Sequence, residues 1–132
     1  MQSFFKKAIN RILGRKYPTD GFFDENGRYI FEVEIIELLK EDGVLEDVIA
    51  VYIIGSVLNL RNKKFVHLLP SDIDIFVQTT TPFPYIRPHK IEINGRQYPV
   101  HWVTYNCHPL EVYPRYNELK LCFECLQIYP RN

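Results

Sequence analysis

The sequence has few cysteines, no long apolar run and no excess of either charge. Its 132 residues include 3 cysteines, an odd and low number that argues against a framework of disulfide bonds. No stretch approaches the roughly 18 consecutive apolar residues of a membrane-spanning helix. The 16 Lys and Arg residues balance the 16 Asp and Glu residues. This balance argues against a protein that coats nucleic acid, because binding to phosphates without sequence preference needs an excess of positive charge.

The first residues also lack the features of a secretory signal. The segment MQSFFKKAINRILGRK contains no uninterrupted apolar core and no cleavage site of small residues. A hydrophobic content of 46% and a charged content of 24% are typical of globular proteins and exclude wholesale disorder. We therefore expect one soluble domain with a hydrophobic core, located in the cytoplasm.

The beginning of the chain is basic and amphipathic. Residues 1–16 contain no acid, and apolar residues recur there at helical spacing. The cations are Lys6, Lys7, Arg11, Arg15 and Lys16, and the apolar residues are Phe5, Ile9, Ile12 and Leu13. We expect residues 1–30 to form a basic helix followed by turns. This helix either packs on the domain or contacts a membrane surface or a polyanion.

Residues 31–132 alternate between helical and strand patterns. The predicted elements are a helix in FEVEIIELLKEDG that ends at Gly43, strands over 48–54 and 71–77, a proline-containing loop over 79–89, a hairpin over 91–105 that turns at Asn94-Gly95, and a helix over 117–128. This order favours an α/β (α+β) domain with a mixed β-sheet and flanking helices.

Asp72 and Asp74 form the most informative pattern in the chain. Side chains alternate along a strand, so both carboxylates are expected on one face while Ile73 and Ile75 point into the core. Two close carboxylates repel each other unless a cation lies between them, and their oxygens suit Mg²⁺, which also binds substrate phosphates. Taken alone, the pattern is also common in exposed acidic pairs on strands.

Gly55 and Ser56 follow the preceding apolar strand. A glycine lets the backbone approach a ligand closely, and the start of a following helix offers N–H groups to a phosphate. A Gly-Ser pair after a strand is by itself most often a turn. Combined with Asp72 and Asp74, the pair predicts a phosphate cradle that faces a metal site.

The combination VYIIGSV…SDIDIFV resembles the signature of the nucleotidyltransferase superfamily, built on the polymerase-β-like fold, and in particular its minimal members. The resemblance covers about residues 31–105. The implied nucleotide-binding residues are Gly55, Ser56 and Ser71, and the implied ligands of one or two Mg²⁺ ions are Asp72 and Asp74. The implied reaction moves a nucleoside monophosphate from a nucleoside triphosphate, expected to be ATP, to a hydroxyl acceptor of unknown identity.

Two features depart from the family pattern. The spacer between Ser56 and Asp72, residues 57–71, is longer than in minimal members. The third carboxylate of active members is also missing, because the position that looks equivalent holds His101. This imidazole could act as a catalytic base, bind a softer metal such as Mn²⁺, or be an ordinary surface histidine. Glu92 is an alternative metal ligand, provided that its strand lies beside Asp72 and Asp74.

The missing carboxylate leaves a second function open. The leading hypothesis is a metal-dependent enzyme that uses Asp72, Asp74 and His101. The alternative is a catalytically impaired member that binds a nucleotide or a protein, as an antitoxin or regulatory module does. The short chain leaves little room for an acceptor-binding domain, so a protein partner, a second copy or the acceptor would complete the cleft. A nucleic acid acceptor remains open, although the neutral net charge gives it no support.

The cysteines offer a weaker alternative site. Cys107, His108, Cys122 and Cys125 are all zinc-type ligands, but adjacent Cys107 and His108 cannot easily turn toward one ion. In the helix predicted over 117–128, Cys122 and Cys125 would be buried as small apolar residues.

Overall fold

The computed structural model describes residues 21–61, 69–82, 84–106 and 124–130. These ranges contain one α-helix, α2 (Glu32–Glu41), two short 3₁₀ helices, η1 (Leu45–Asp47) and η2 (Ser56–Arg61), and five strands, β1 (Val48–Ile54), β2 (Ile73–Thr79), β3 (Lys90–Ile93), β4 (Arg96–Asn106) and β5 (Cys125–Tyr129). The basic helix predicted near the start of the chain lies outside the described residues, as do Cys107, His108 and Cys122.

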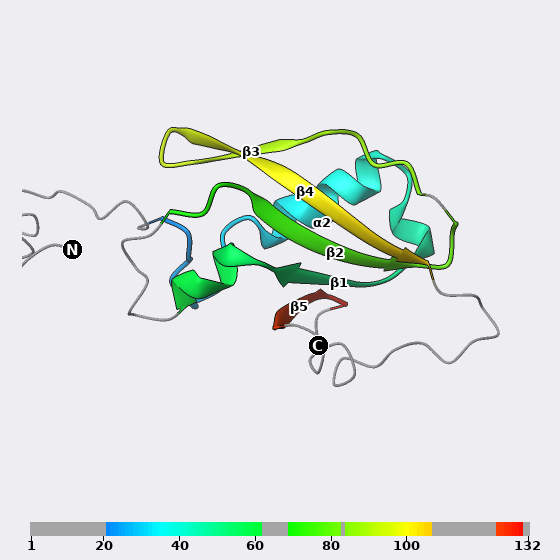
Figure 1. Ribbon diagram of the computed structural model, residues 1–132, viewed down its shortest axis with the longest axis horizontal. Coiled ribbons are helices and arrows are strands. Elements are labelled where there is room, and N and C mark those ends of the chain that lie inside the picture. Colours follow the sequence, from blue (N-terminus) through cyan, green and yellow to red (C-terminus); the bar gives the residue numbers. More distant parts are fainter. Residues whose placement is uncertain (1–20, 62–68, 83, 107–123, 131–132) are drawn as a thin grey trace, which may run out of the picture.

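The strands form one mixed sheet in the order β3-β4-β2-β1-β5 (Figure 1). All neighbouring strands are antiparallel except β2 and β4, which are parallel. After β2, the chain forms β3 at one edge of the sheet and then returns as β4, which lies between β3 and β2. The prediction of an α+β domain with a mixed sheet is thus confirmed.

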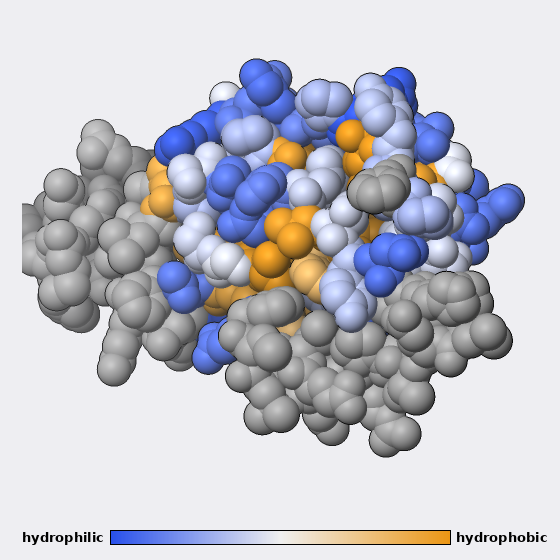
Figure 2. All heavy atoms as spheres, turned by 45° about the vertical axis from the view of Figure 1, so that its right-hand side comes forward, coloured by the Kyte–Doolittle hydropathy of each residue, from blue (hydrophilic) through white to orange (hydrophobic). Residues whose placement is uncertain are grey.

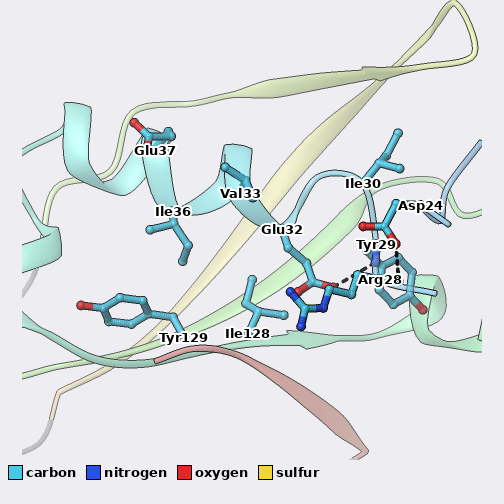
Figure 3. Close-up of a pocket in the computed structure, with 10 residues that line it drawn as sticks. All are labelled: Asp24, Arg28, Tyr29, Ile30, Glu32, Val33, Ile36, Glu37, Ile128 and Tyr129. Carbon is cyan, nitrogen blue, oxygen red and sulfur yellow. Dashed lines mark hydrogen bonds between the residues drawn. The ribbon is translucent and has the colours of Figure 1, made fainter. Parts of the chain in front are cut away.

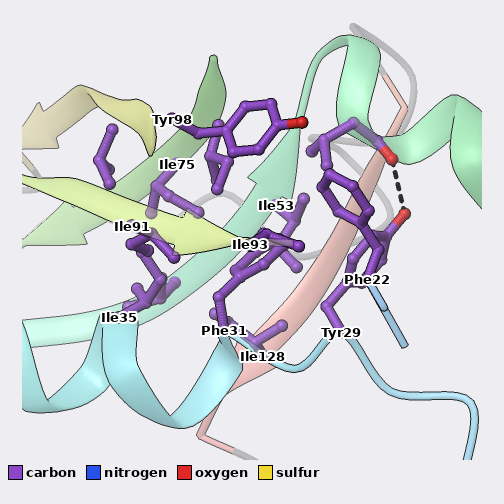
Figure 4. Close-up of a cluster of buried hydrophobic side chains, with 14 of the residues drawn as sticks. Phe22, Tyr29, Phe31, Ile35, Ile53, Ile75, Ile91, Ile93, Tyr98 and Ile128 are labelled. Atoms are coloured by element: carbon purple, nitrogen blue, oxygen red, sulfur yellow. Dashed lines mark hydrogen bonds between the residues drawn. The ribbon is translucent and has the colours of Figure 1, made fainter. Parts of the chain in front are cut away.

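Helix α2 packs on one face of this sheet. Its residues Ile35 and Leu39 are fully buried, four positions apart, as the amphipathic pattern requires. The predicted glycine cap is also present, because Gly43 has a φ of 73° and the Val44 N–H donates to the Leu39 carbonyl at 3.1 Å. Figure 4 shows Ile35 beside Ile91, in the same buried cluster as Ile53 and Ile75.

Residues 21–30 contribute to the core between α2 and the sheet, although the sequence pattern predicted a separate turn segment there. Phe22 and Tyr29 are 0% and 2% exposed and pack with the residues of α2 and the sheet. The predicted turn lies between them, where the Asp24 carboxylate accepts the N–H groups of Asn26 and Arg28. The aromatic residues on either side of this turn therefore anchor the entry to α2.

The opposite face of the sheet carries a smaller apolar cluster of Ala50, Tyr52 and Phe76. In the space-filling view, apolar residues gather at the centre of the visible face, with hydrophilic residues around them (Figure 2). Because side chains alternate along β2, Asp74 shares the face of Phe76, while Ile73 and Ile75 are fully buried on the α2 side. The predicted division of β2 into an acidic face and a core face is confirmed.

The prediction of a helix over 117–128 is wrong for residues 124–128, the part that the structure describes. Residues Cys125–Tyr129 form strand β5, which pairs antiparallel with β1. Without this pairing, the free edge of β1 would leave backbone N–H and C=O groups without partners. A short apolar run such as this one fits either a helix or a strand, and the edge of β1 decides the outcome.

Candidate metal centre

Asp72, Asp74 and His101 come together where β2 and β4 run side by side. The parallel register places Asp74 directly opposite His101. One ligand atom from each of the three side chains lies within 4.8 Å of the other two. No other group of three or more His, Cys, Asp or Glu residues in the described ranges is gathered in this way. The strand pattern predicted that the two aspartates share a face, and the pairing with β4 adds the histidine.

Asp74 and His101 are in direct contact. The His101 Nδ1 atom lies 2.9 Å from Asp74 Oδ1, and in the tautomer that is protonated at Nδ1 it donates a hydrogen bond to the carboxylate. The Asp74 side chain is 20% exposed and that of His101 is 65% exposed. The site is therefore open to solvent on one side, while the core supports it from behind.

Gly55 lies against Asp74 at the end of β1. Ile54 pairs with Asp74 across the β1–β2 ladder, and the chain then turns at Gly55 with a φ of 78°. A Cβ atom on Gly55 would overlap the Oδ2 atom of Asp74. The backbone at Gly55 therefore lies close to the Asp74 carboxylate, and its predicted approach to a bound phosphate stays a prediction.

Ser56 and Ser71 lie at the borders of the same region. Ser56 is exposed and begins η2, so the helix start predicted after the glycine is a short 3₁₀ helix. The Tyr29 hydroxyl donates to the Val57 carbonyl at 2.8 Å and ties η2 to the core. Burial raises the pKa of Tyr29 well above its ordinary value, despite the opposing charge of Arg61, so the phenol stays a donor at neutral pH. Ser71 is exposed and precedes β2.

The structure does not bring Glu92 to this group. Glu92 is exposed on β3, opposite Gln97, and β4 separates its strand from β2. Gln97 precedes His101 by four residues on β4, a shift of roughly 13 Å along the strand at the rise of an extended chain. Of the two residues considered in place of the third carboxylate, His101 is therefore the one beside Asp72 and Asp74.

The donor set of the candidate centre combines two carboxylates with one imidazole. Carboxylate oxygens suit Mg²⁺ and Mn²⁺, whereas imidazole nitrogen suits transition metals better than Mg²⁺. The residues present therefore fit a divalent ion that tolerates both kinds of ligand, with Mn²⁺ as the better match. Cys125, the one predicted zinc ligand in the described ranges, is half-buried on β5 and belongs to no such group.

A second polar cluster was not anticipated from the sequence. The Asp42 side chain, at the end of α2, is 1% exposed and pairs with the Arg87 guanidinium. The Arg87 backbone N–H also donates to Asp42 at 2.9 Å, and His89 Nε2 lies 3.6 Å from the carboxylate. Arg87 and His89 lie in the loop before β3, and no motif links this loop to α2.

The chain matches no protein-family model, and no curated protein or solved structure matches it. None of the helices in the described residues is long and apolar enough to cross a membrane. Fold and site together define an α+β domain with a five-stranded mixed sheet and a candidate metal centre on the face opposite α2.

Proposed function

We propose that this protein is a metal-dependent nucleotidyltransferase that moves a nucleoside monophosphate from a nucleoside triphosphate, ATP in the first instance, to a hydroxyl acceptor. The observation that supports it is the gathering of Asp72, Asp74 and His101, with Gly55 packed against Asp74. These residues belong to the Gly-Ser and Asp-Ile-Asp segments that resemble the nucleotidyltransferase signature. The polymerase-β-like fold is part of the same proposal, and the cytoplasmic location stays a prediction.

Each residue has a distinct role in this proposal. Asp72 and Asp74 hold the divalent ion. The backbone of Gly55 and the hydroxyls of Ser56 and Ser71 bind the nucleotide. When bound, the ion neutralises charge on the transferring phosphate and lowers the pKa of the acceptor hydroxyl.

His101 either completes the ligand set or accepts the proton of the acceptor hydroxyl. In the second case Asp74 orients the ring through Nδ1, which leaves Nε2 to take the proton. The hydroxyl oxygen then bonds to the α-phosphorus, and the bond from that phosphorus to the pyrophosphate oxygen breaks.

The test is transfer of label from α-labelled nucleoside triphosphates in the presence of Mn²⁺ or Mg²⁺. We expect Asp74→Asn to reduce transfer by at least about a hundredfold, because loss of a metal ligand removes several kcal/mol of charge stabilisation. Glu92→Gln is the matched control, since it removes a carboxylate from the same sheet at a distance from the site. Equal transfer by wild type and Asp74→Asn would contradict the role of Asp74 in the site. A loss of transfer in Glu92→Gln as large as in Asp74→Asn would contradict the exclusion of Glu92 from the site.

A nucleotide- or protein-binding module without turnover is the second candidate. The exposed imidazole of His101, in the place expected for a third carboxylate, favours it. In calorimetry, metal-dependent binding of ATP without transfer would support this module over the enzyme. A protein partner or a second copy would then complete the cleft, and co-purification would identify it.

A further inference from the structure

A groove runs between helix α2 and the edge strand β5, apart from the candidate metal centre (Figure 3). Its volume is about 340 Å³. Six of its ten lining residues are aliphatic or aromatic: Tyr29, Ile30, Val33 and Ile36 from α2 and its entry, and Ile128 and Tyr129 from β5. In Figure 3 the Ile36 side chain extends from α2 toward Ile128 and Tyr129.

Two apolar residues of this groove are unusually exposed. The side chain of Val33 is 73% exposed and that of Ile30 is 45% exposed. The groove also lies at β5, an outermost strand of the sheet. Exposed apolar side chains beside a sheet edge are typical of a surface that another segment covers.

The groove lies in the most acidic part of the chain. Asp24, Glu32 and Glu37 line it, against Arg28 as the single cation. The lining residues themselves thus carry a formal charge of −2. An occupant of this groove should therefore be both apolar and positively charged.

We propose that residues 1–16 of the same chain dock in this groove. That segment carries 5 cations and no acid, and its apolar residues recur at helical spacing, so it has the two properties that the groove requires. The apolar stripe contacts the residues between α2 and β5, and the cations lie against the acidic rim.

The chain connection allows this docking. Residues 17–20 join the segment to Gly21, where the described structure begins, and Asp24 already lines the groove. Four extended residues span roughly 14 Å, which is comparable to the length of a ten-residue helix such as α2. By contrast, residues 107–123 contain 2 acids and 2 bases, so charge does not direct them to this groove.

Photo-crosslinking from position 33 in the full-length chain tests the docking. A photoreactive phenylalanine analogue in place of Val33 occupies an exposed position, so the fold should tolerate it. We expect crosslinks within one chain to residues 5–16. Crosslinks between two copies, crosslinks to residues 107–123, or the absence of crosslinks would each overturn the proposal.

Hydrogen exchange provides a second readout with a matched pair of variants. Glu37→Lys reverses a charge on the groove, and Glu34→Lys makes the same change on an exposed position of α2 that does not line it. We expect amide exchange in residues 5–16 to be about tenfold faster in Glu37→Lys, a change of about 1.4 kcal/mol, and near the wild-type rate in Glu34→Lys. Equal rates in the two variants, or rates of an unstructured peptide in the wild type, would contradict docking.

Discussion

Gly55 shows how a single backbone conformation prepares the candidate metal centre. Its positive φ turns the chain at the end of β1, and its missing side chain leaves the space that the Asp74 carboxylate occupies. The sequence allowed the prediction that a ligand-binding strand ends in a glycine. It did not identify Asp74 as the neighbour, because the contact depends on the pairing of β1 with β2.

Gly55→Ala should therefore disturb both stability and metal binding. A left-handed conformation costs an alanine about 1–2 kcal/mol, and displacement of Asp74 adds a steric cost of about 1–3 kcal/mol. Gly27→Ala is the control, because Gly27 has a similar φ of 76° but no atom within 4 Å of an added Cβ. Urea unfolding and Mn²⁺ titration measure the two effects. If Gly27→Ala weakened Mn²⁺ binding as much, the contact with Asp74 would not be the cause.

At the scale of elements, residue patterns predicted most of the individual helices, strands and turns, but not which strands pair. Asn94 and Gly95 adopt positive φ values of 54° and 79°, as the hairpin between β3 and β4 was expected to require. The placement of β4 beside β2, and thus of His101 beside Asp74, could not be read from residue patterns because it depends on which strand edges meet. The pairing of β5 with β1 and the contact of α2 with Arg87 could not be predicted for the same reason.

The contact between α2 and the loop before β3 predicts a dependence of stability on pH. Burial opposes ionisation of Asp42, but hydrogen bonds from the Arg87 backbone and guanidinium, together with Arg87 and His89 charge, outweigh it and lower the pKa of Asp42. The unfolded state then binds more protons than the folded state. This contribution is complete above the unfolded value of about 3.9 and is lost as the pH falls through the lower folded value.

Asp42→Asn tests this sign directly. We expect the difference in unfolding free energy between wild type and Asp42→Asn to shrink as the pH falls below about 4. Glu34→Gln, which changes an exposed carboxyl of the same helix, is the control. A difference that grows as the pH falls below 4 would contradict the assigned direction.

At the scale of the whole molecule, the candidate metal centre depends on three strands at once. Gly55 follows β1, Asp74 lies on β2 and His101 lies on β4. An ion held by these residues would bind the folded chain and not the unfolded one, because no unfolded segment holds this donor set together.

Mn²⁺ should therefore stabilise the protein against heat. At a free concentration of 100 times the dissociation constant, binding adds about 2.7 kcal/mol, which raises the Tm by several degrees. We expect Mn²⁺ to act more strongly than Mg²⁺ at equal concentration, and Asp74→Asn to abolish the shift. Glu46→Gln, which removes an exposed acid of η1, should keep it. An undiminished shift in Asp74→Asn would place the ion elsewhere.

The parallel pairing of β2 with β4 also has a consequence for folding kinetics. The β3–β4 hairpin closes over a two-residue turn, whereas Asp74 and His101 are 27 positions apart and meet only when that hairpin inserts beside β2. Local contacts form quickly, and contacts between distant parts of the chain form late because loop closure costs entropy. By this criterion we expect the centre to form after the hairpin but before β5 pairs with β1, where Ile54 and Cys125 are 71 positions apart. A partly folded chain that contained only the hairpin would then have no affinity for metal.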